Sequence, residues 1–450
     1  MTDATADSAS APPQAAPPSA RAFNPGYVRY AMVLLLIVYT LNFVDRQIVS
    51  ILNEDIKEAL GASDTQMGLL GGLAFALFYT TLGIPIAVLA DRGNRVKIIA
   101  TGLAIWSAMT AVCGLATNFL QIFLARIGVG VGEAACTPPA QSLIADYVPA
   151  ERRASAMAFY ALGIPLGTML GFAFGGIFAQ AFGWRAALLL AGGPGVILAV
   201  IVWLTLKEPR LHLPKRAHGP PASRPSVGDY LKLFANPTYV HLCCAGGVAA
   251  FVGYGLSYWL PAYFIRAFQM SVLEVGLVFG VALGFTGMIG TMLGGLIVDH
   301  FKKRFPGAIM AVPATALLVA SPAFILALTA PTKWTAIAFL AAPLMLNSFW
   351  YGPAFAAVQS LVAPSQRATA TAIYLFVVNL IGLGGGIPFV GWLSDHLGQI
   401  AQAGDIPLGM NTAVAALPLR WSIVIVGTLG LWATVHMFLA ARTMRRDVVS

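Results

Sequence analysis

Long apolar runs alternate with short polar breaks along nearly the whole chain after residue 24. A helix needs about 20 apolar residues to cross the hydrocarbon core of a bilayer, and runs of that length recur along the chain. They cover residues 28–52, 66–90, 97–117, 119–145, 154–180, 185–206, 238–267, 273–299, 307–329, 334–361, 369–395 and 419–441. This pattern predicts an all-α membrane protein with twelve transmembrane helices.

Polar segments divide the chain into two similar parts. Residues 207–237 form a proline-rich break, so we expect an N-terminal six-helix bundle at 25–206 and a C-terminal six-helix bundle at 238–441. Residues 1–24 are rich in Ala, Pro and Ser without an apolar core, which is typical of a disordered tail and not of a cleavable signal peptide. Residues 442–450 form a second polar tail.

The charges support a membrane protein of defined orientation. Only 10% of residues are charged, against about 25% in soluble domains, which excludes a soluble enzyme. Most of the 27 Lys and Arg residues fall in one alternate set of breaks, and the positive-inside rule places both termini and the 207–237 linker in the cytoplasm. These residues form short tracts between apolar runs, so the net charge of +9 does not indicate a nucleic-acid partner.

The two parts of the sequence repeat each other. Residues 153–160 and 367–374 share five identities in eight positions, and Asp91 after the second run corresponds to Asp299 after the eighth. Such duplication is typical of transporters built from two related bundles around a midplane site. We therefore expect two pseudosymmetric six-helix bundles.

Motifs for other energy sources and for catalysis are missing from the sequence. It contains no Gly-x-x-x-x-Gly-Lys-Ser/Thr phosphate loop, no His-Glu-x-x-His pattern and no Gly-x-Ser-x-Gly elbow. The four cysteines lie in apolar runs, which favours packing over a disulfide framework. We expect a secondary transporter driven by a gradient, with no enzymatic activity, no metal and no cofactor.

The break after the second run carries a recognisable motif. Asp91, Arg92 and Arg95 resemble the signature loop of the major facilitator superfamily, with Ala87 and Asn94 where that loop has glycine. A carboxylate at a helix end that faces basic residues of a neighbour can latch two bundles, although a basic loop can also serve only to set topology. The candidate cytoplasmic gate comprises Asp91, Arg92, Arg95, Arg153, Asp299 and Arg367.

The fourth run extends this resemblance. Arg126, followed by Gly128, Gly130 and Gly132, is similar to the superfamily pattern for the fourth helix. The resemblance covers nearly the whole chain beyond residue 25. It implies the major facilitator fold and transport by alternating access, in which the two bundles rock about a central site.

Four ionisable residues lie at membrane depth, where charges are costly and default to functional candidates. Asp45 and Arg46 lie in the first run, and Arg126 and Glu133 lie seven positions apart on one face of the fourth. They form either a static salt-bridge network or a proton and anion site that changes partners during transport. We favour Asp45 and Glu133 as proton-coupling residues. Arg46 is the favoured residue for binding the anion, and Arg126 is the alternative.

The second part of the chain has aromatic residues where the first has charges. The internal repeat aligns Glu133 with Tyr351 and Arg46 with Tyr258. A cavity with one polar and one aromatic wall suits an amphipathic substrate with an anionic or zwitterionic head. Our candidate substrate-binding residues are Arg46, Arg126, Tyr39, Asn42, Tyr254, Tyr258, Trp350, Tyr351 and Tyr374.

Three short segments resemble the Spinster family of lipid transporters. These are residues 39–46, the loop at 91–94, and residues 130–134. The resemblance implies proton-linked movement of a lysophospholipid or a sphingosine-1-phosphate-like lipid, with the Asp-Arg pair of the first helix and the Glu of the fourth at the site. We expect a bacterial inner-membrane version that works as a monomer.

Other functions are compatible with the same fold. One is a proton-coupled exporter of drugs or a transporter of small organic anions. A second is a channel or lipid scramblase that needs no coupling. A third is a non-transporting receptor, which the candidate gate at Asp91 and Asp299 argues against.

Overall fold

The computed structural model describes residues 23–212, 233–305, 307–363, 366–403 and 416–447. The described residues form helices joined by short turns, without a β-strand among them. Most of the predicted tails and of the 207–237 linker lies outside these residues. At the C-terminal end, α20 (Gly430–Asp447) continues beyond the expected boundary at residue 441.

The N-terminal half begins with a long helix whose first turn is capped by Asn24. Its helices are α1 (Pro25–Ile51), α2 (Asn53–Leu60), α3 (Asp64–Gly71), α4 (Leu73–Arg92), α5 (Arg95–Cys113), α6 (Phe119–Glu133), α7 (Thr137–Tyr147), η2 (Ala150–Arg152), α8 (Arg153–Ala161), α9 (Gly163–Thr205) and α10 (Pro209–His212). Helix α9 includes two crossings, because Gly183 turns the chain with φ 80°, a value that favours glycine.

The C-terminal half repeats this arrangement. Its helices are α12 (Pro237–Phe268), α13 (Val272–Phe301), α14 (Ala308–Leu328), α15 (Lys333–Asn347), α16 (Tyr351–Ser360), α17 (Arg367–Ile381), the π-helix η4 (Gly382–Gly386), α18 (Ile387–Gln402), α19 (Leu417–Thr428) and α20. The fourth crossing of the N-terminal half breaks just after Glu133, and its counterpart breaks just before Tyr351. This match confirms the predicted repeat.

The predicted number of spans is confirmed. Ten helical stretches of the described chain are long and apolar enough to cross a membrane. One of them, Ser155–Leu211, holds 57 residues and turns at Gly183, so it supplies two crossings. The broken pair α15 and α16 supplies the twelfth.

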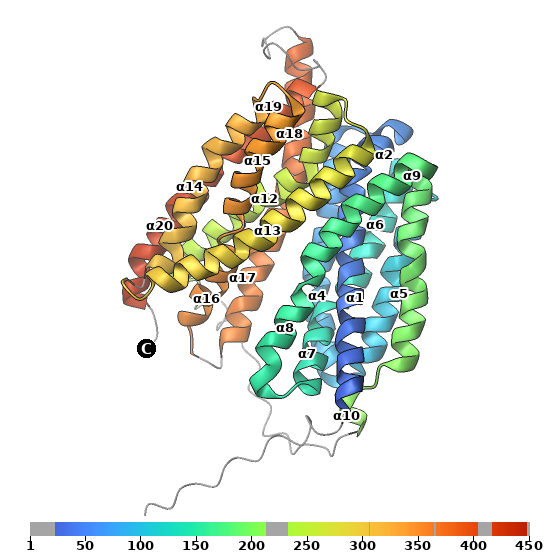
Figure 1. Ribbon diagram of the computed structural model, residues 1–450, viewed down its shortest axis with the longest axis vertical. Coiled ribbons are helices and arrows are strands. Elements are labelled where there is room, and N and C mark those ends of the chain that lie inside the picture. The colour runs from blue at the N-terminus through green and yellow to red at the C-terminus, as the bar shows by residue number, and fades with distance from the viewer. Residues whose placement is uncertain (1–22, 213–232, 306, 364–365, 404–415, 448–450) are drawn as a thin grey trace, which may run out of the picture.

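The two halves meet at one end and diverge at the other (Figure 1). One end, which we call the linker end, carries the start of α1, the short helix α10 and the end of α20. At this end α7 and α8 stand apart from α16 and α17. The other end, which we call the Asp64 end, carries α2 and the start of α3. Helices α9 and α13 pack closely against each other between the halves. The close approach is seen at Gly276, where an added Cβ would lie only 3.0 Å from the Cα of Gly176.

Candidate functional site

The central feature of the N-terminal half is an ion pair between α1 and α6. Nε of Arg46 donates to Oε2 of Glu133 over 2.7 Å. The Glu133 side chain is fully buried, whereas that of Arg46 is 16% exposed. The Arg46 guanidinium carbon lies 4.5 Å from the ring centre of Tyr79 and 4.8 Å from that of Phe75. Two of the four charged residues predicted from the sequence thus form an ion pair in an aromatic pocket that leaves the Arg46 side chain partly accessible.

The other two charges are arranged differently. Nη1 of Arg126 donates to the backbone carbonyl of Asp45 over 3.3 Å, and not to its carboxylate. Trp106 and Thr110, both on α5, lie beside the Asp45 carboxyl group. These two residues were not among those predicted from the sequence, although their spacing of four places them on one face of the 97–117 run. Asp45 therefore has polar neighbours but no ion pair with a described residue.

Several polar atoms in this region are buried without a hydrogen-bond partner among the described residues. They are Nδ2 and Oδ1 of Asn42, Oδ1 of Asp45, Nε1 of Trp106, Oγ1 of Thr110, Nε of Arg126 and Oε1 of Glu133. Each such group destabilises a fold by about 1–3 kcal/mol. A purely static salt-bridge network would pair both acids with both bases, so this arrangement favours a site with spare capacity for protons or ligands.

Two tyrosines of the C-terminal half approach the same region. Tyr254 on α12 lies close enough to Arg46 for electrostatic interaction, and Tyr351 lies similarly close to Tyr254. Tyr351 also stacks on Trp350 with ring centres 4.2 Å apart. Tyr374 is fully buried within its own half. The structure thus brings Tyr254 and Tyr351 toward the charged cluster, with Trp350 and Tyr374 behind them.

The three remaining candidates surround the charged cluster, since Tyr39 lies within electrostatic reach of Arg46 and Tyr258 within that of Arg126. Tyr258 donates from its hydroxyl to the carbonyl of Met67 over 3.0 Å, and so joins the halves near the Asp64 end. Tyr39 stacks on Tyr160 with ring centres 4.3 Å apart and an interplanar angle of 8°. Asn42 lies beside Glu133.

The four predicted gate residues whose side chains are described are not brought together across the halves. Arg95 is fully buried and binds Glu208 and Asp146, both of its own half. Arg153 donates to the carbonyl of Val148 over 3.3 Å. In the C-terminal half, Asp299 pairs with the nearby Lys302 at the surface, and Arg367 is exposed. The side chains of Asp91 and Arg92 lie outside the described part of the structure.

Polar contacts between the halves gather at the Asp64 end instead. Arg266 of α12 pairs with Glu54 and Asp64, and Asp395 of α18 binds the start of α3. These residues do not stand out in the sequence, where charges at helix ends indicate mainly the membrane topology. Their partners come from positions more than 200 residues apart, so no local pattern connects them.

Comparison of the chain with models of protein families identifies its superfamily. The model of the Major Facilitator Superfamily matches residues 35–386. The chain belongs to this superfamily. Its twelve spans in two halves are therefore those of a major facilitator transporter, a multi-pass integral membrane protein and not an enzyme.

Individual relatives narrow the family further. An MFS-type efflux pump of Mycolicibacterium smegmatis is 34% identical over 421 residues, covering 93% of this chain and 94% of the pump. Protein spinster homolog 1 of Xenopus laevis is 27% identical over 443 residues, covering 94% and 84%. The sphingosine-1-phosphate transporter SPNS2 of Danio rerio is 26% identical over 421 residues, covering 89% and 83%.

A solved structure agrees with these relatives. It is the crystal structure of a bacterial homologue of the human lysosomal transporter Spinster, in an inward-facing and unoccupied conformation. Its TM-score with this chain is 0.86 at 33% identity, covering 95% of this chain and 100% of that chain. The protein is thus a Spinster-like transporter with bacterial homologues.

Proposed function

We propose that this transporter couples proton movement to the movement of an amphipathic anionic substrate by alternating access. The observation that carries the proposal is the arrangement of Asp45, Arg46 and Glu133. Arg46 is bound by Glu133 yet remains partly exposed, and the adjacent Asp45 carboxylate has no ion pair with a described residue. One cation can therefore be shared between a protein carboxylate and a substrate anion.

Protonation of Glu133 would release Arg46. A neutral carboxyl group holds a guanidinium more weakly than a carboxylate does, because the Coulomb attraction is lost. An anionic head group would then replace Glu133 on the fork of donors of Arg46. Asp45 supplies a second carboxyl group that can hold a proton, with Trp106 and Thr110 beside it. In this scheme proton uptake and anion binding favour each other.

The opposite wall suits an apolar tail. Tyr254 and Tyr351 approach the site from the C-terminal half, while Phe75 and Tyr79 line the Arg46 side. Aromatic rings bind apolar chains and tolerate a polar head at their edge. The similarity to Spinster proteins, including one named as a sphingosine-1-phosphate transporter, supports a lysolipid or sphingosine-1-phosphate-like substrate.

Drug export is the second candidate. It is favoured by the 34% identity to an MFS-type efflux pump over 93% of this chain. The same aromatic wall would accept other amphipathic anions. The distinction therefore lies in which anions compete at Arg46.

We further propose a monomer in the bacterial inner membrane with both termini and the linker end in the cytoplasm. The distribution of Lys and Arg supports this orientation. In this orientation the Asp91 and Asp299 loops lie at the cytoplasmic end, where they would form the gate when the halves approach each other there.

The test is substrate-induced proton movement in proteoliposomes that contain a pH dye. Lysophospholipid, sphingosine-1-phosphate, small organic acids and anionic drugs are offered separately, with Asp45→Asn as the control. A lipid-dependent signal that is lost in the variant supports coupling and substrate class together. A signal with drugs or small acids but none with lipids overturns the lipid assignment, and equilibration without accumulation under a pH gradient overturns coupling.

A further inference from the structure

Two histidines of the C-terminal half meet between its first and last helices. His241 lies on α12 and His436 on α20, and their Nδ1 atoms are 3.0 Å apart. The ring centres are 5.2 Å apart, with an interplanar angle of 44°. The two residues are 195 positions apart in the sequence, so no local pattern connects them and the sequence predicted no metal. Their ring nitrogens converge because α12 packs against α20.

The pair lies near the linker end of these two helices. His241 follows the first residue of α12 by four positions, or about 6 Å. One turn closer to the linker end, the Thr238 hydroxyl donates to the Asp447 carboxylate over 2.6 Å and joins the same two helices. Both histidines are half-buried, and Trp432 beside His436 is 55% exposed. Partial exposure near a helix end leaves the pair within reach of ions at the membrane surface.

The spacing of the two Nδ1 atoms fits two neighbouring ligands of one metal ion. With a metal–nitrogen distance of about 2.0–2.1 Å, two ligands at a right angle lie about 2.8–3.0 Å apart, and two tetrahedral ligands lie about 3.3–3.4 Å apart. The observed distance of 3.0 Å equals the first spacing, and a small rotation of the rings would give the second. Imidazole is a preferred ligand of Cu²⁺, Ni²⁺ and Zn²⁺.

A hydrogen bond between the two rings is the alternative to a metal ion. One neutral ring would then donate its N–H and the other would accept it. Such a bond adds little stability where both rings are also accessible to water. Both histidines lie within membrane-spanning stretches, where ionisable side chains are costly and commonly functional. The location therefore favours a ligand-binding role over a purely structural one.

We propose that His241 and His436 form a binding site for a divalent transition-metal ion that prefers imidazole, such as Cu²⁺, Ni²⁺ or Zn²⁺. Each Nδ1 would coordinate the ion, and each ring would carry its proton on Nε2. The described residues contain no group of three or more His, Cys, Asp or Glu side chains that could hold a metal. The pair therefore supplies two ligands, and water fills the other positions. A bound ion ties the first helix of the C-terminal half to its last helix.

The first test uses Cu²⁺ as the probe. It binds nitrogen ligands more tightly than Ni²⁺ or Zn²⁺, and its electron paramagnetic resonance spectrum reports the nitrogen atoms that coordinate it. The full chain is purified with a tag that contains no histidine and is placed in lipid nanodiscs. The partly exposed Cys244 is changed to Ser beforehand, so that its thiol does not react with Cu²⁺. We expect one Cu²⁺ per chain, coordinated by two imidazole nitrogens.

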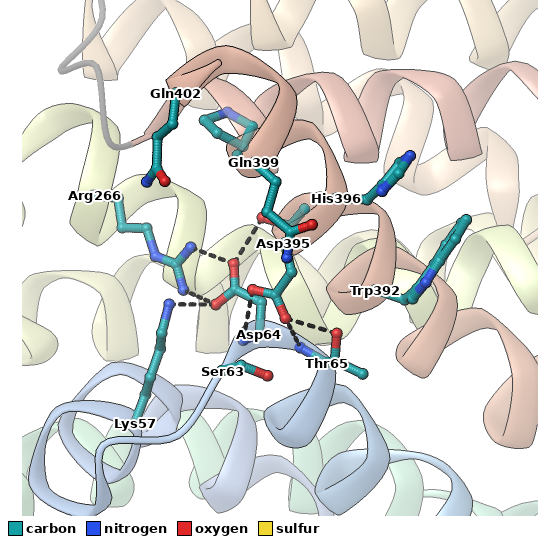
Figure 2. A pocket seen from close by; sticks show the side chains of 13 residues that line it. Lys57, Ser63, Asp64, Thr65, Arg266, Trp392, Asp395, His396, Gln399 and Gln402 are labelled. Carbon is teal, nitrogen blue, oxygen red and sulfur yellow. Dashed lines mark hydrogen bonds and ion pairs between the residues drawn. The ribbon is translucent and has the colours of Figure 1, made fainter.

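His241→Asn and His436→Asn should each weaken Cu²⁺ binding by about tenfold or more and remove one of the two nitrogen signals. Asparagine keeps a hydrogen-bonding group near the position of Nδ1 but is a much poorer ligand for Cu²⁺. His396→Asn is the matched control, because His396 lies at the Asp64 end and stacks on Trp392 with ring centres 5.5 Å apart (Figure 2). This variant should bind Cu²⁺ like the Cys244→Ser chain.

Two outcomes of this test would overturn the site. One is unchanged affinity and an unchanged spectrum in both the His241 and the His436 variants. The other is a Cys244→Ser chain that binds no Cu²⁺ at equimolar concentration, which would leave a hydrogen-bonded pair only.

Thermal unfolding in detergent covers the case in which one histidine variant does not fold. An ion that binds only the folded chain raises the melting temperature. Ni²⁺ should therefore raise the melting temperature of the Cys244→Ser chain, whereas Mg²⁺, which prefers oxygen ligands, should not. Equal shifts with Ni²⁺ and Mg²⁺, or a full Ni²⁺ shift in a folded His241 or His436 variant, would overturn the site. Neither measurement needs a substrate or a proton gradient, so the result is independent of the proposed transport function.

Discussion

Arg46 and Glu133 lie 87 positions apart in the sequence, yet Nε of Arg46 is 2.7 Å from Oε2 of Glu133. The ion pair joins α1 to α6 inside one half of the transporter, and the break after Glu133 ends α6 at this point. The second oxygen of Glu133 is buried without a hydrogen-bond partner among the described residues. Glu133 is therefore not fixed by a complete set of hydrogen bonds, which is what the proposed exchange of its partner requires.

Glu133→Gln should separate substrate binding from proton coupling. The amide keeps the shape of the side chain but cannot hold Arg46 as an ionic partner, so anionic substrates should bind about tenfold more tightly at neutral pH. The pH dependence of binding should also diminish. Equilibrium binding of a fluorescent lysolipid between pH 5 and 8 checks this. Weaker binding at every pH would assign Glu133 a structural role.

Arg46→Ala should discriminate between head groups. The loss of the guanidinium should weaken the binding of anionic lysolipids about 10- to 100-fold, because a charge-assisted contact in a partly buried site is removed. Zwitterionic lysolipids should lose less. Competition binding with both head groups on one acyl chain gives the ratio. Arg126→Ala is the comparison, and a larger anion-specific loss there would make Arg126 the anchor.

The sequence predicted the fold and the charged cluster because both leave local signals. Apolar runs gave the spans, and the spacing of seven between Arg126 and Glu133 placed them on one face. Which acid pairs with which base depends on how α1 packs on α6, and no periodicity contains that information. The pairing of Arg266 with Asp64 likewise depends on how the two halves dock.

Gly132→Leu should destabilise the N-terminal half. A Cβ at this position would lie 2.6 Å from the backbone nitrogen of Trp106 and 2.8 Å from the carbonyl oxygen of Gly102, so α6 and α5 must move apart. Overpacking of this kind costs about 1–3 kcal/mol. Thermal unfolding in detergent measures it. Gly352→Ala is the control, because no atom beyond its chain neighbours and its own helix backbone lies within 4 Å of its Cβ position. Equal destabilisation there would contradict the close-packing argument.

Arg95→Gln tests whether Arg95 is a gate residue or a structural one. The motif at Asp91 suggested a contact between the halves, but Arg95 binds Glu208 and Asp146 of its own half. The Arg95 side chain is 0% exposed and that of Glu208 is 2% exposed. The variant leaves the Glu208 carboxylate buried without its partner, which should lower the free energy of unfolding by about 3–5 kcal/mol.

The control for this prediction is the exposed pair between Asp299 and Lys302, whose loss in Lys302→Gln should change stability by about 1 kcal/mol or less. Arg95→Gln with Glu208→Gln should recover part of the loss, because the unpaired buried charge is then removed as well. Denaturant titration of the four proteins in detergent gives these free energies. A different result would contradict the structural role: Arg95→Gln unfolds at the same denaturant concentration as the unaltered chain, but changes the distance between spin labels placed at Glu151 and Gln366. Arg95 would then act between the halves, and its contacts with Glu208 would contribute little to stability.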